Sequence, residues 1–276
     1  MYLRPVRLTD ALACLAHYKP AILAGGTDFY SARGSRPVAD DVLDISAIAE
    51  LKGIREEADH WHFGALATWT EIIEAPLTRD LDCLKLAARG IGGPQIRNAG
   101  TIGGNVCNLS PSADGIPALL ALDAGVELRS AAGTRTLALA DFLSDNHTAL
   151  ARNELICAIR VPKRSRAVRS TFVKLAARRY LAISIATVAV ALELSHDGVI
   201  VRAGIAVGGC SRSARRLSEL ERELIGRSVR GGLGALVVPR HLIAITPVSD
   251  VHATAEYRRD AAITLLRRAL GQVTYE

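Results

Sequence analysis

The chain of 276 residues is long enough for two domains or one large one, and it can bury a sizeable hydrophobic core. Hydrophobic residues make up 49% of the sequence and charged residues 22%, which describes an ordinary soluble globular protein. The formal net charge of +6 invites a nucleic-acid partner, but an aromatic content of 4% leaves few side chains to stack on bases, so we expect none.

Apolar periodicity and turn residues predict the elements of the N-terminal half. A short helix should start within Leu8–Leu12, with Thr9 or Asp10 as its N-cap. A buried strand is expected at Ala21–Ala24, where it ends in a pair of glycines. The other predicted elements are strands at Val42–Ile45, Trp61–Ala67, Val126–Arg129 and Leu155–Val161, and helices near Thr70–Glu74, at Leu81–Arg89 and after a cap at Ser112 or Asp114.

The C-terminal half begins where the sequence becomes charged and loses its periodicity, around Arg164–Arg169, which marks a candidate domain boundary. Beyond it, Asp197–Gly198 is a strong signal for a hairpin turn between two apolar runs. The predicted elements of this half are strands at Ile183–Leu194 and Val199–Val207, helices at Arg215–Leu224 and Ala255–Leu270, and a mobile loop at Gly231–Gly234.

The sequence also bears on the location of the chain. Its longest apolar run is interrupted by Ser184 and Thr187 and is too short for a membrane span. Arg4 and Arg7 precede any apolar run at the N-terminus, which is unlike a signal peptide. We therefore expect a cytoplasmic chain.

Two glycine-bearing segments, Ala24–Asp28 and Thr101–Asn105, are the most informative local motifs. Adjacent glycines allow positive φ angles and close backbone approach, so that successive N–H groups can point into one concavity that suits a phosphate. Two such concavities suit a diphosphate held from two sides, whereas the plain alternative is two glycine turns on a β-rich domain. Rival motifs are missing, because the sequence holds no GxxxxGK[ST] P-loop, no GxGxxG and no GxSxG.

The five cysteines are widely scattered, with no CxxC pair. Iron–sulfur clusters and structural zinc sites need clustered thiolates, so neither is expected. We expect reduced and mostly buried thiols. The cysteines are Cys14, Cys83, Cys107, Cys157 and Cys210.

Basic residues gather in three short clusters, Lys163–Arg169, Arg178–Arg179 and Arg212–Arg216. Two interpretations stay open. The clusters form an ordinary solvated surface, or one of them faces an acidic ferredoxin-like partner, where complementary charge speeds docking.

Longer strings around the glycine motifs carry a family resemblance. LAGGTD (Leu23–Asp28) and IRNAGTIGGNVCNLSPSADGIPALLALDA (Ile96–Ala124) closely resemble the FAD-binding subunits of the molybdenum hydroxylase family. That family includes the flavin subunits of xanthine dehydrogenase, carbon monoxide dehydrogenase and 4-hydroxybenzoyl-CoA reductase. Similar strings follow in the same order at Pro76–Leu77, Phe172–Leu175 and Ala255–Arg259, so the resemblance spans nearly the whole chain. The chain lacks the cysteine-rich insertion of the 4-hydroxybenzoyl-CoA reductase type.

The resemblance implies an α+β, PCMH-type FAD-binding fold. Two small α/β subdomains, at about residues 1–55 and 56–166, would hold the flavin. A small C-terminal α+β domain would follow at residues 167–276.

The resemblance also implies where FAD is held. The stretch Ile22–Phe29 would line the adenosine diphosphate part, and Thr101–Asn105 would grip the same diphosphate from the other side. Asp114 would bind a sugar or ribityl hydroxyl, and Ile91 would pack against the flavin ring. The implied cofactor-binding residues are Ile22, Leu23, Ala24, Gly25, Gly26, Thr27, Asp28, Phe29, Ile91, Thr101, Ile102, Gly103, Gly104, Asn105, Asp114, Ile156 and Lys174, the last two contacting the adenine or the isoalloxazine. No catalytic residue and no metal ligand is assigned.

The function implied is electron transfer within a complex. Electrons would pass from [2Fe–2S] clusters of a small partner subunit through FAD to NAD or another acceptor, after substrate oxidation at a large molybdenum-cofactor subunit. Two alternatives stay open: a stand-alone FAD-dependent oxidoreductase of the same fold, and a non-catalytic scaffold that has lost flavin. Ala99 departs from an arginine that is common in the family after the Ile-Arg-Asn motif.

Overall fold

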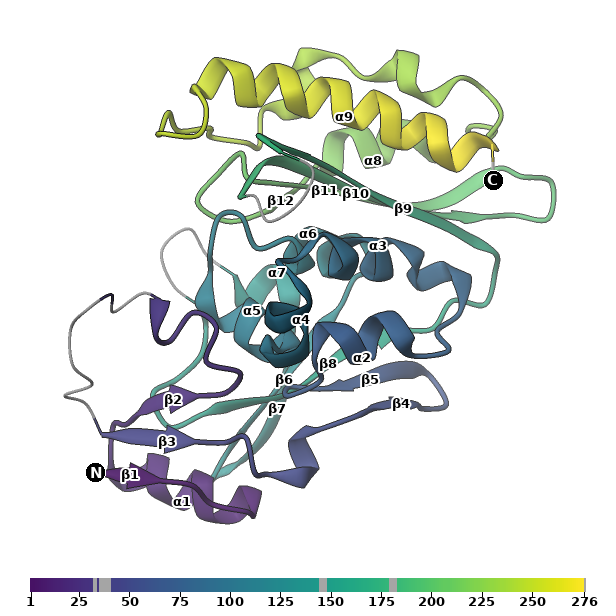
Figure 1. The fold of residues 1–276 in the computed structure, drawn as a ribbon. Coiled ribbons are helices and arrows are strands. Elements are labelled where there is room, and N and C mark those ends of the chain that lie inside the picture. Colours follow the sequence, from purple (N-terminus) through teal and green to yellow (C-terminus); the bar gives the residue numbers. More distant parts are fainter. Residues whose placement is uncertain (32–33, 35–40, 144–147, 179–182, 276) are drawn as a thin grey trace.

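Within the described residues, three β-sheets and the helices between them organise the chain (Figure 1). The structure is a computed structural model that describes residues 1–31, 34, 41–143, 148–178 and 183–275. A layer of helices lies between a five-stranded and a four-stranded sheet, and a long C-terminal helix covers the outer face of the latter (Figure 1). The mixture of sheets and separate helices is α+β, as predicted. The domain limits predicted at residues 55 and 166 stay predictions.

The smallest sheet is parallel and has the order β1 (Tyr2–Leu3), β3 (Val42–Asp44), β2 (Ala21–Leu23). Helix α1 (Leu8–His17) buries Leu8, Ala11, Leu12 and Leu15, which recur at helical spacing.

The predicted N-cap of α1 is wrong, because the helix already begins at Leu8. Its first N–H group donates to Glu50 Oε2 at 2.8 Å, so a distant carboxylate takes the place of a local cap. The predicted cap Asp10 instead forms an ion pair with Arg7 at 2.8 Å.

The five-stranded sheet is antiparallel. Its order is β4 (Ile54–Glu56), β5 (His60–Gly64), β8 (Leu155–Pro162), β6 (Gly125–Ser130), β7 (Gly133–Ala138). The helices of this region are α2 (Trp69–Glu74), α3 (Asp82–Gly90), α4 (Pro94–Ala99), α5 (Ile102–Asn108), α6 (Gly115–Ala121) and α7 (Leu139–Phe142). Predicted strands and helices agree with these bounds to within a few residues, but β4, β7, α4, α5 and α7 were not predicted.

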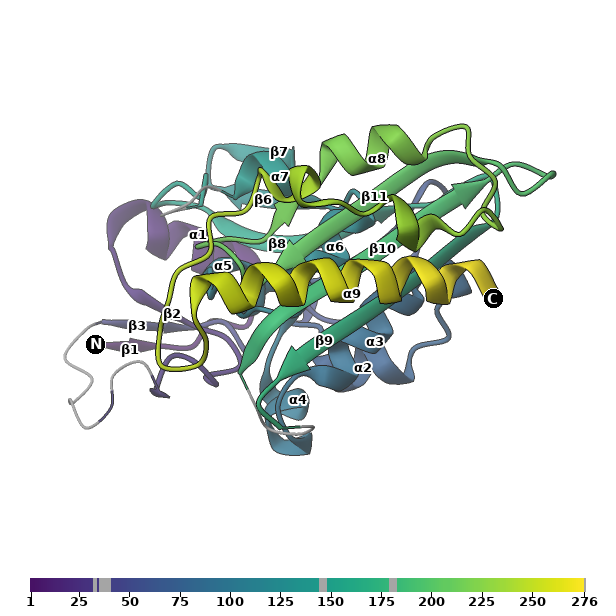
Figure 2. The same ribbon diagram turned by 90° about the horizontal axis from the view of Figure 1, so that it is seen from above.

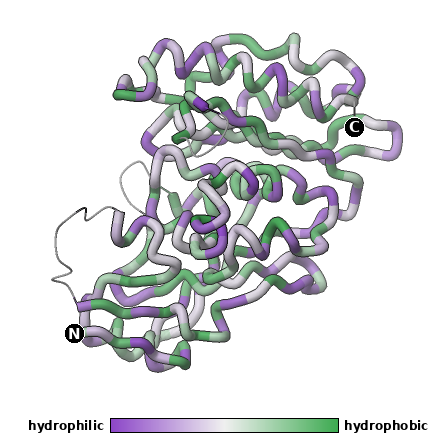
Figure 3. The backbone as a smooth tube through the Cα atoms, viewed as in Figure 1, coloured by the Kyte–Doolittle hydropathy of each residue, from purple (hydrophilic) through white to green (hydrophobic). Residues whose placement is uncertain are grey.

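The four-stranded sheet is also antiparallel, with the order β12 (Arg215–Arg216), β11 (Ile200–Gly208), β10 (Ser184–Leu194), β9 (Val168–Ala176). One face contacts α3 and α6, and α9 (Ala255–Tyr275) lies across the other (Figure 2). Because both faces are covered, β10 is almost continuously apolar and buried. The region of the four-stranded sheet is largely hydrophobic in Figure 3. Among the described residues, no helix is both long and apolar enough to cross a membrane.

Two predictions in this region need correction. The helix predicted to start at Arg215 begins at Ser218 (α8, Ser218–Leu224), because the two preceding arginines pair with β11 as strand β12. The segment predicted as a mobile loop begins a 3₁₀ turn at Leu233–Leu236, whose first side chain is buried against the C-terminal core.

Several residues of the basic clusters connect the two halves of the chain. Asp123 has a positive φ of 56° and accepts three guanidinium groups: Arg164 at 2.6 Å, Arg202 at 3.0 Å and Arg216 at 2.6 Å. Arg169 donates to the carbonyl oxygens at the end of α9, Val273 and Thr274, at 2.9 and 3.0 Å. These arginines serve internal contacts, which weakens the interpretation of their clusters as a docking surface. Arg179 lies outside the described residues.

We expect Asp123→Asn to lower the free energy of unfolding by about 2 kcal/mol, because hydrogen bonds to charged groups of this kind are worth more than neutral ones. Asparagine tolerates a positive φ, so the change removes the charge and spares the backbone. Urea unfolding measures the difference, with Asp197→Asn at the exposed hairpin turn as the control. Equal stability of the two variants would contradict a structural role for Asp123.

Candidate functional site

A cavity of about 580 Å³ lies among the first glycine segment, helices α4 and α5, and the start of β8. Most residues predicted to bind the cofactor line it: Ile22, Ala24, Gly25, Gly26, Thr27, Asp28, Phe29, Ile91, Thr101, Gly103, Gly104, Asn105 and Ile156. Leu23 and Ile102 are buried in the core instead, and Asp114 and Lys174 lie outside the lining. Other residues that line the cavity were not predicted. Ile45, Trp69, Leu150 and Glu154 come from segments without a motif, and Ile96 begins the second motif string but was assigned no role.

The first glycine segment is a tight turn at the end of β2. Gly26 has a φ of +74°, a conformation that favours glycine. Gly25 lies so close to the backbone of α4 that a Cβ there would overlap the carbonyl oxygen of Ala99. The backbone N–H groups of Gly25–Asp28 donate no hydrogen bond to any part of the chain that the structure describes. Four neighbouring donors are therefore available to a ligand in the cavity.

The second glycine segment is not the open loop that the sequence predicted, but the first turn of α5. Thr101 is its N-cap, and its Oγ1 accepts the N–H of Gly104 at 3.1 Å. The N–H groups of Ile102 and Gly103 donate to the carbonyls of Ala67 and Ala65, both at 2.9 Å. These amides already have partners, so this segment cannot offer them freely to a phosphate.

Helix α5 lies close to the neighbouring segment at Ala65 and provides the cavity with one polar side chain, that of Asn105. A Cβ on Gly103 would lie 2.7 Å from the carbonyl oxygen of Ala65, so glycine is needed for α5 to reach the neighbouring segment. The buried Oδ1 of Asn105, a lining residue, has no hydrogen-bond partner within the described ranges. An unpaired buried acceptor is costly, which indicates that a bound molecule supplies its donor.

The two ends of the cavity differ. The end at β2, at the residue after β3 and at β8 with the segment before it carries the apolar side chains of Ile22, Ile45, Leu150, Leu155 and Ile156. The other end is formed by the turn after α3, by α4 and by the segment before α6, and is lined by Ile91, Ile96, Ser110, Ser112 and Ala113. The glycine turn with its four donors belongs to the same cavity. The lining therefore offers apolar side chains and, at the glycine turn, backbone donors to one ligand.

An ion pair holds the wall beside the apolar end. Arg135 on β7 binds Glu154 through a fork, with Nε at 2.7 Å and Nη2 at 2.8 Å, and also donates to the carbonyl of Ala149 at 2.8 Å. The hydrogen bonds from Arg135 lower the pKa of the Glu154 carboxyl below its ordinary value. This fork fixes the backbone next to Leu150, a lining residue.

Buried Asp114 and half-buried Lys174 form an ion pair beside the turn after α3 and do not line the cavity. Lys174 Nζ lies 2.6 Å from Asp114 Oδ2 and donates to the carbonyl of Gly90 at 3.0 Å. Ser184 Oγ donates to Asp114 Oδ1 at 2.6 Å. Burial raises the pKa of the Asp114 carboxyl, although Lys174 opposes the shift. Asp114 occupies the predicted N-cap position of α6, but its side chain faces Lys174 and makes no cap hydrogen bond.

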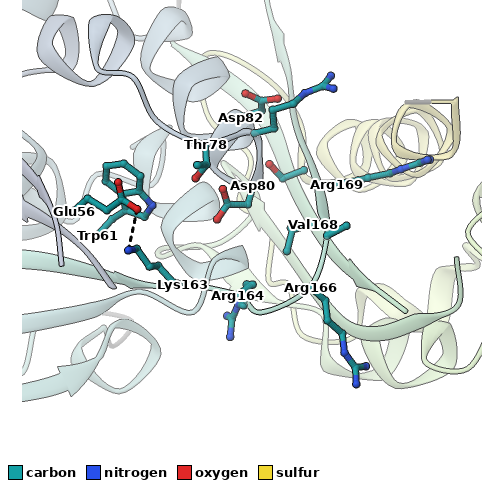
Figure 4. A pocket seen from close by; sticks show the side chains of 13 residues that line it. Glu56, Trp61, Thr78, Asp80, Asp82, Lys163, Arg164, Arg166, Val168 and Arg169 are labelled. Atoms are coloured by element: carbon teal, nitrogen blue, oxygen red, sulfur yellow. Dashed lines mark ion pairs between the residues drawn. The ribbon is translucent and has the colours of Figure 1, made fainter. Parts of the chain in front are cut away.

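A second cavity of about 530 Å³ lies where the linker between the two halves passes strand β5 and the start of α3 (Figure 4). Lys163 pairs with Glu56 at 2.9 Å, and Arg164 is bound to Asp123. The carboxylates of Asp80 and Asp82 also line it, so its charge is mixed. This cavity is poorly suited to a diphosphate.

Glu219, Glu223 and His241 place three possible metal ligands within 4.8 Å of one another. His241 Nδ1 accepts the N–H of Val238 at 3.2 Å, so in the neutral ring Nε2 carries the proton and has no lone pair for a metal. Arg240 binds both carboxylates, at 3.4 and 2.7 Å. The group is therefore an ion-pair cluster between α8 and the following segment.

Comparison with known proteins gives consistent matches. Residues 1–164 match the family described as "FAD binding domain in molybdopterin dehydrogenase", and residues 171–273 match "CO dehydrogenase flavoprotein C-terminal domain". The nicotinate dehydrogenase FAD-subunit of Eubacterium barkeri is 37% identical over 82% of this chain and 79% of its own length. The carbon monoxide dehydrogenase medium chain of Afipia carboxidovorans is 32% identical over 98% of this chain and 94% of its own. A structure of reconstituted CO dehydrogenase from Oligotropha carboxidovorans superposes with a TM-score of 0.91 at 29% identity, covering 99% of this chain and 97% of that one.

Proposed function

The chain belongs to the family of FAD-binding subunits of molybdenum hydroxylases, and on this premise we propose that it relays electrons from a partner's iron–sulfur clusters through FAD held in the first cavity. The family consists of oxidoreductase subunits, and the predicted α+β, PCMH-type fold and FAD cofactor agree with these matches. NAD or another small oxidant is proposed as the acceptor.

The observation that carries the proposal is the set of uncommitted N–H groups at Gly25–Asp28. A diphosphate needs several donors at short range, and backbone amides supply them without steric cost. The orphaned Oδ1 of Asn105 adds an acceptor in the same cavity, which suits a hydroxyl group of a sugar or ribityl chain. Both features fit FAD better than they fit a purely structural cavity.

We assign the ends of the cavity accordingly. The apolar end around Ile22 and Ile156 would hold the adenine, and the end around Ile91 and Ile96 would hold the isoalloxazine. Thr101, Gly103 and Gly104 would support the diphosphate, because they form the first turn of α5 and let its backbone lie close to the cavity. Leu23 and Ile102 would support the two glycine segments by packing in the core. Asp114 and Lys174 would support the turn after α3 without lining the cavity. When bound, FAD supplies the redox chemistry, and the residues named here bind and orient it.

The chain's own thiols are poor candidates for a second redox centre. Burial raises the pKa of Cys83 and Cys157 to about 12 each and that of Cys210 to about 11, which disfavours the thiolate form that binds iron. Cys14 and Cys107 are not buried.

Relatives such as the nicotine 6-hydroxylase medium subunit of Paenarthrobacter nicotinovorans are subunits by name. We propose a small [2Fe–2S] subunit and a large molybdenum-cofactor subunit as partners.

We expect the purified chain to carry FAD and to hydroxylate no organic substrate, because we propose that the substrate is oxidised at the molybdenum cofactor of the large partner subunit. Co-expression with the two proposed partner subunits should yield a complex in which substrate reduces the flavin. Stopped-flow absorbance near the flavin maximum measures this reduction, with the isolated chain as the control. Substrate oxidation by the isolated chain would instead favour a stand-alone oxidoreductase, and a colourless chain that rejects added FAD would favour a scaffold.

A further inference from the structure

The C-terminal end of α3 is bound by two cationic side chains. Four successive carbonyl groups, those of Arg89, Gly90, Ile91 and Gly92, point to the nitrogens of Arg97 and Lys174. Arg97 Nη1 lies 3.1 Å from the oxygen of Gly92 and 3.4 Å from those of Arg89 and Ile91. Cations are favourable here, because the last carbonyls of a helix are unpaired and carry its negative dipole end.

The turn that these cations hold forms one end of the first cavity. Ile91 lies in that turn and lines the cavity, as does Ile96, one residue before Arg97. Gly92 has a φ of +50°, and a Cβ there would lie 2.7 Å from the side chain of Ile96. The turn is therefore tightly folded against α4, and Arg97 on α4 donates hydrogen bonds to its carbonyl groups.

We propose that Arg97 is a positioning residue for the flavin ring, holding the turn at residues 89–92 so that Ile91 keeps its place in the cavity wall. This inference rests on the proposed function, because it assumes that the isoalloxazine occupies the Ile91 end. Arg97 acts through the turn and does not itself line the cavity. None of the α4 residues is buried, so removing the guanidinium opens no hole in the core.

The test is titration of flavin-free protein with FAD and, separately, with ADP. On the proposed assignment, ADP would fill only the apolar end and the glycine turn, whereas FAD would also occupy the end at Ile91. For Arg97→Gln we expect the dissociation constant of FAD to rise about tenfold and that of ADP to stay unchanged, the size expected for losing charged hydrogen bonds. The visible circular dichroism of the bound flavin should change as well, because the ring environment is altered.

Two further variants separate this role from general stability. Arg97→Lys keeps a cation and should recover part of the affinity for FAD. Arg89→Gln is the matched control, because this exposed side chain belongs to the same turn and makes no hydrogen bond to the described residues; it should bind both ligands like the parent chain.

The outcomes are distinguishable. Equal weakening of FAD and ADP by Arg97→Gln, unchanged binding of both, or an equal effect of Arg89→Gln would each overturn the positioning role while leaving FAD binding in place. A parent chain that binds neither FAD nor ADP would overturn the proposed function and this inference together.

Discussion

Replacing Gly25 by alanine is expected to abolish the retention of FAD. A Cβ at this position would overlap the carbonyl oxygen of Ala99. The Cβ is fixed to the backbone and the carbonyl is part of it, so neither can rotate away as the end of a side chain could. Relief requires the glycine turn to separate from α4, which would redirect the N–H groups of Gly25–Asp28. Overpacking of this kind costs on the order of 3 kcal/mol. The flavin-to-protein absorbance ratio after dialysis measures the loss.

Gly271→Ala provides the control for this substitution. It also adds one methyl group, but in α9, where the new Cβ has no atom within 4 Å apart from the neighbouring residues and the backbone of the helix itself. We expect it to keep its flavin and to gain up to about 1 kcal/mol of stability from the higher helix propensity of alanine. If Gly25→Ala kept full flavin occupancy, the diphosphate would have to be bound elsewhere.

Lys174→Met is expected to lower the free energy of unfolding by about 3–5 kcal/mol, the range seen when one partner of a buried ion pair is removed. Asp114 would be left as a buried carboxylate with Ser184 as its remaining hydrogen-bond donor. The carbonyl of Gly90 would also lose its partner, so flavin affinity should fall with stability. Urea unfolding of the flavin-free protein measures the first effect and FAD titration the second.

This loss should depend on pH. Burial raises the pKa of Asp114 in the folded state, and removing Lys174 takes away the charge that opposes the rise. The folded variant then binds a proton that the unfolded chain releases, so its stability falls as pH rises through the folded-state pKa. The destabilisation should be smaller at pH 5 than at pH 8. The double variant with Asp114→Asn should lose most of this pH dependence, and an unchanged dependence would mean that another group causes it.

The sequence was a good guide where a local signal also decides the structure. Ala21–Leu23 is an apolar run that ends in two glycines, and it is a strand followed by a tight turn. Asp197–Gly198 sits between two apolar runs, and it joins β10 and β11 as predicted. In both places the residues that form the turn are those that tolerate its backbone angles, so no distant contact is needed.

The second glycine segment shows where local signals fail. Two adjacent glycines disfavour a helix, yet α5 forms there because Thr101 caps it and the carbonyls of Ala65 and Ala67 bind its first amides. Those carbonyls belong to a segment far away in the sequence. The pairing of Asp114 with Lys174 likewise depends on how the four-stranded sheet packs on α6. Neither contact could be read from spacing.

The contacts of Arg216 show why arginine, rather than any basic residue, is needed at this position. The guanidinium of Arg216 binds Glu221 through Nε, Asp123 and the carbonyl of Leu120 through Nη1, and the carbonyl of Ala203 through Nη2. Its flat fork presents donors in several directions at once, whereas the ammonium of lysine is a single point. Exchanging this arginine for lysine would preserve the formal net charge of the chain, but one ammonium group could not bind all four of these partners at once.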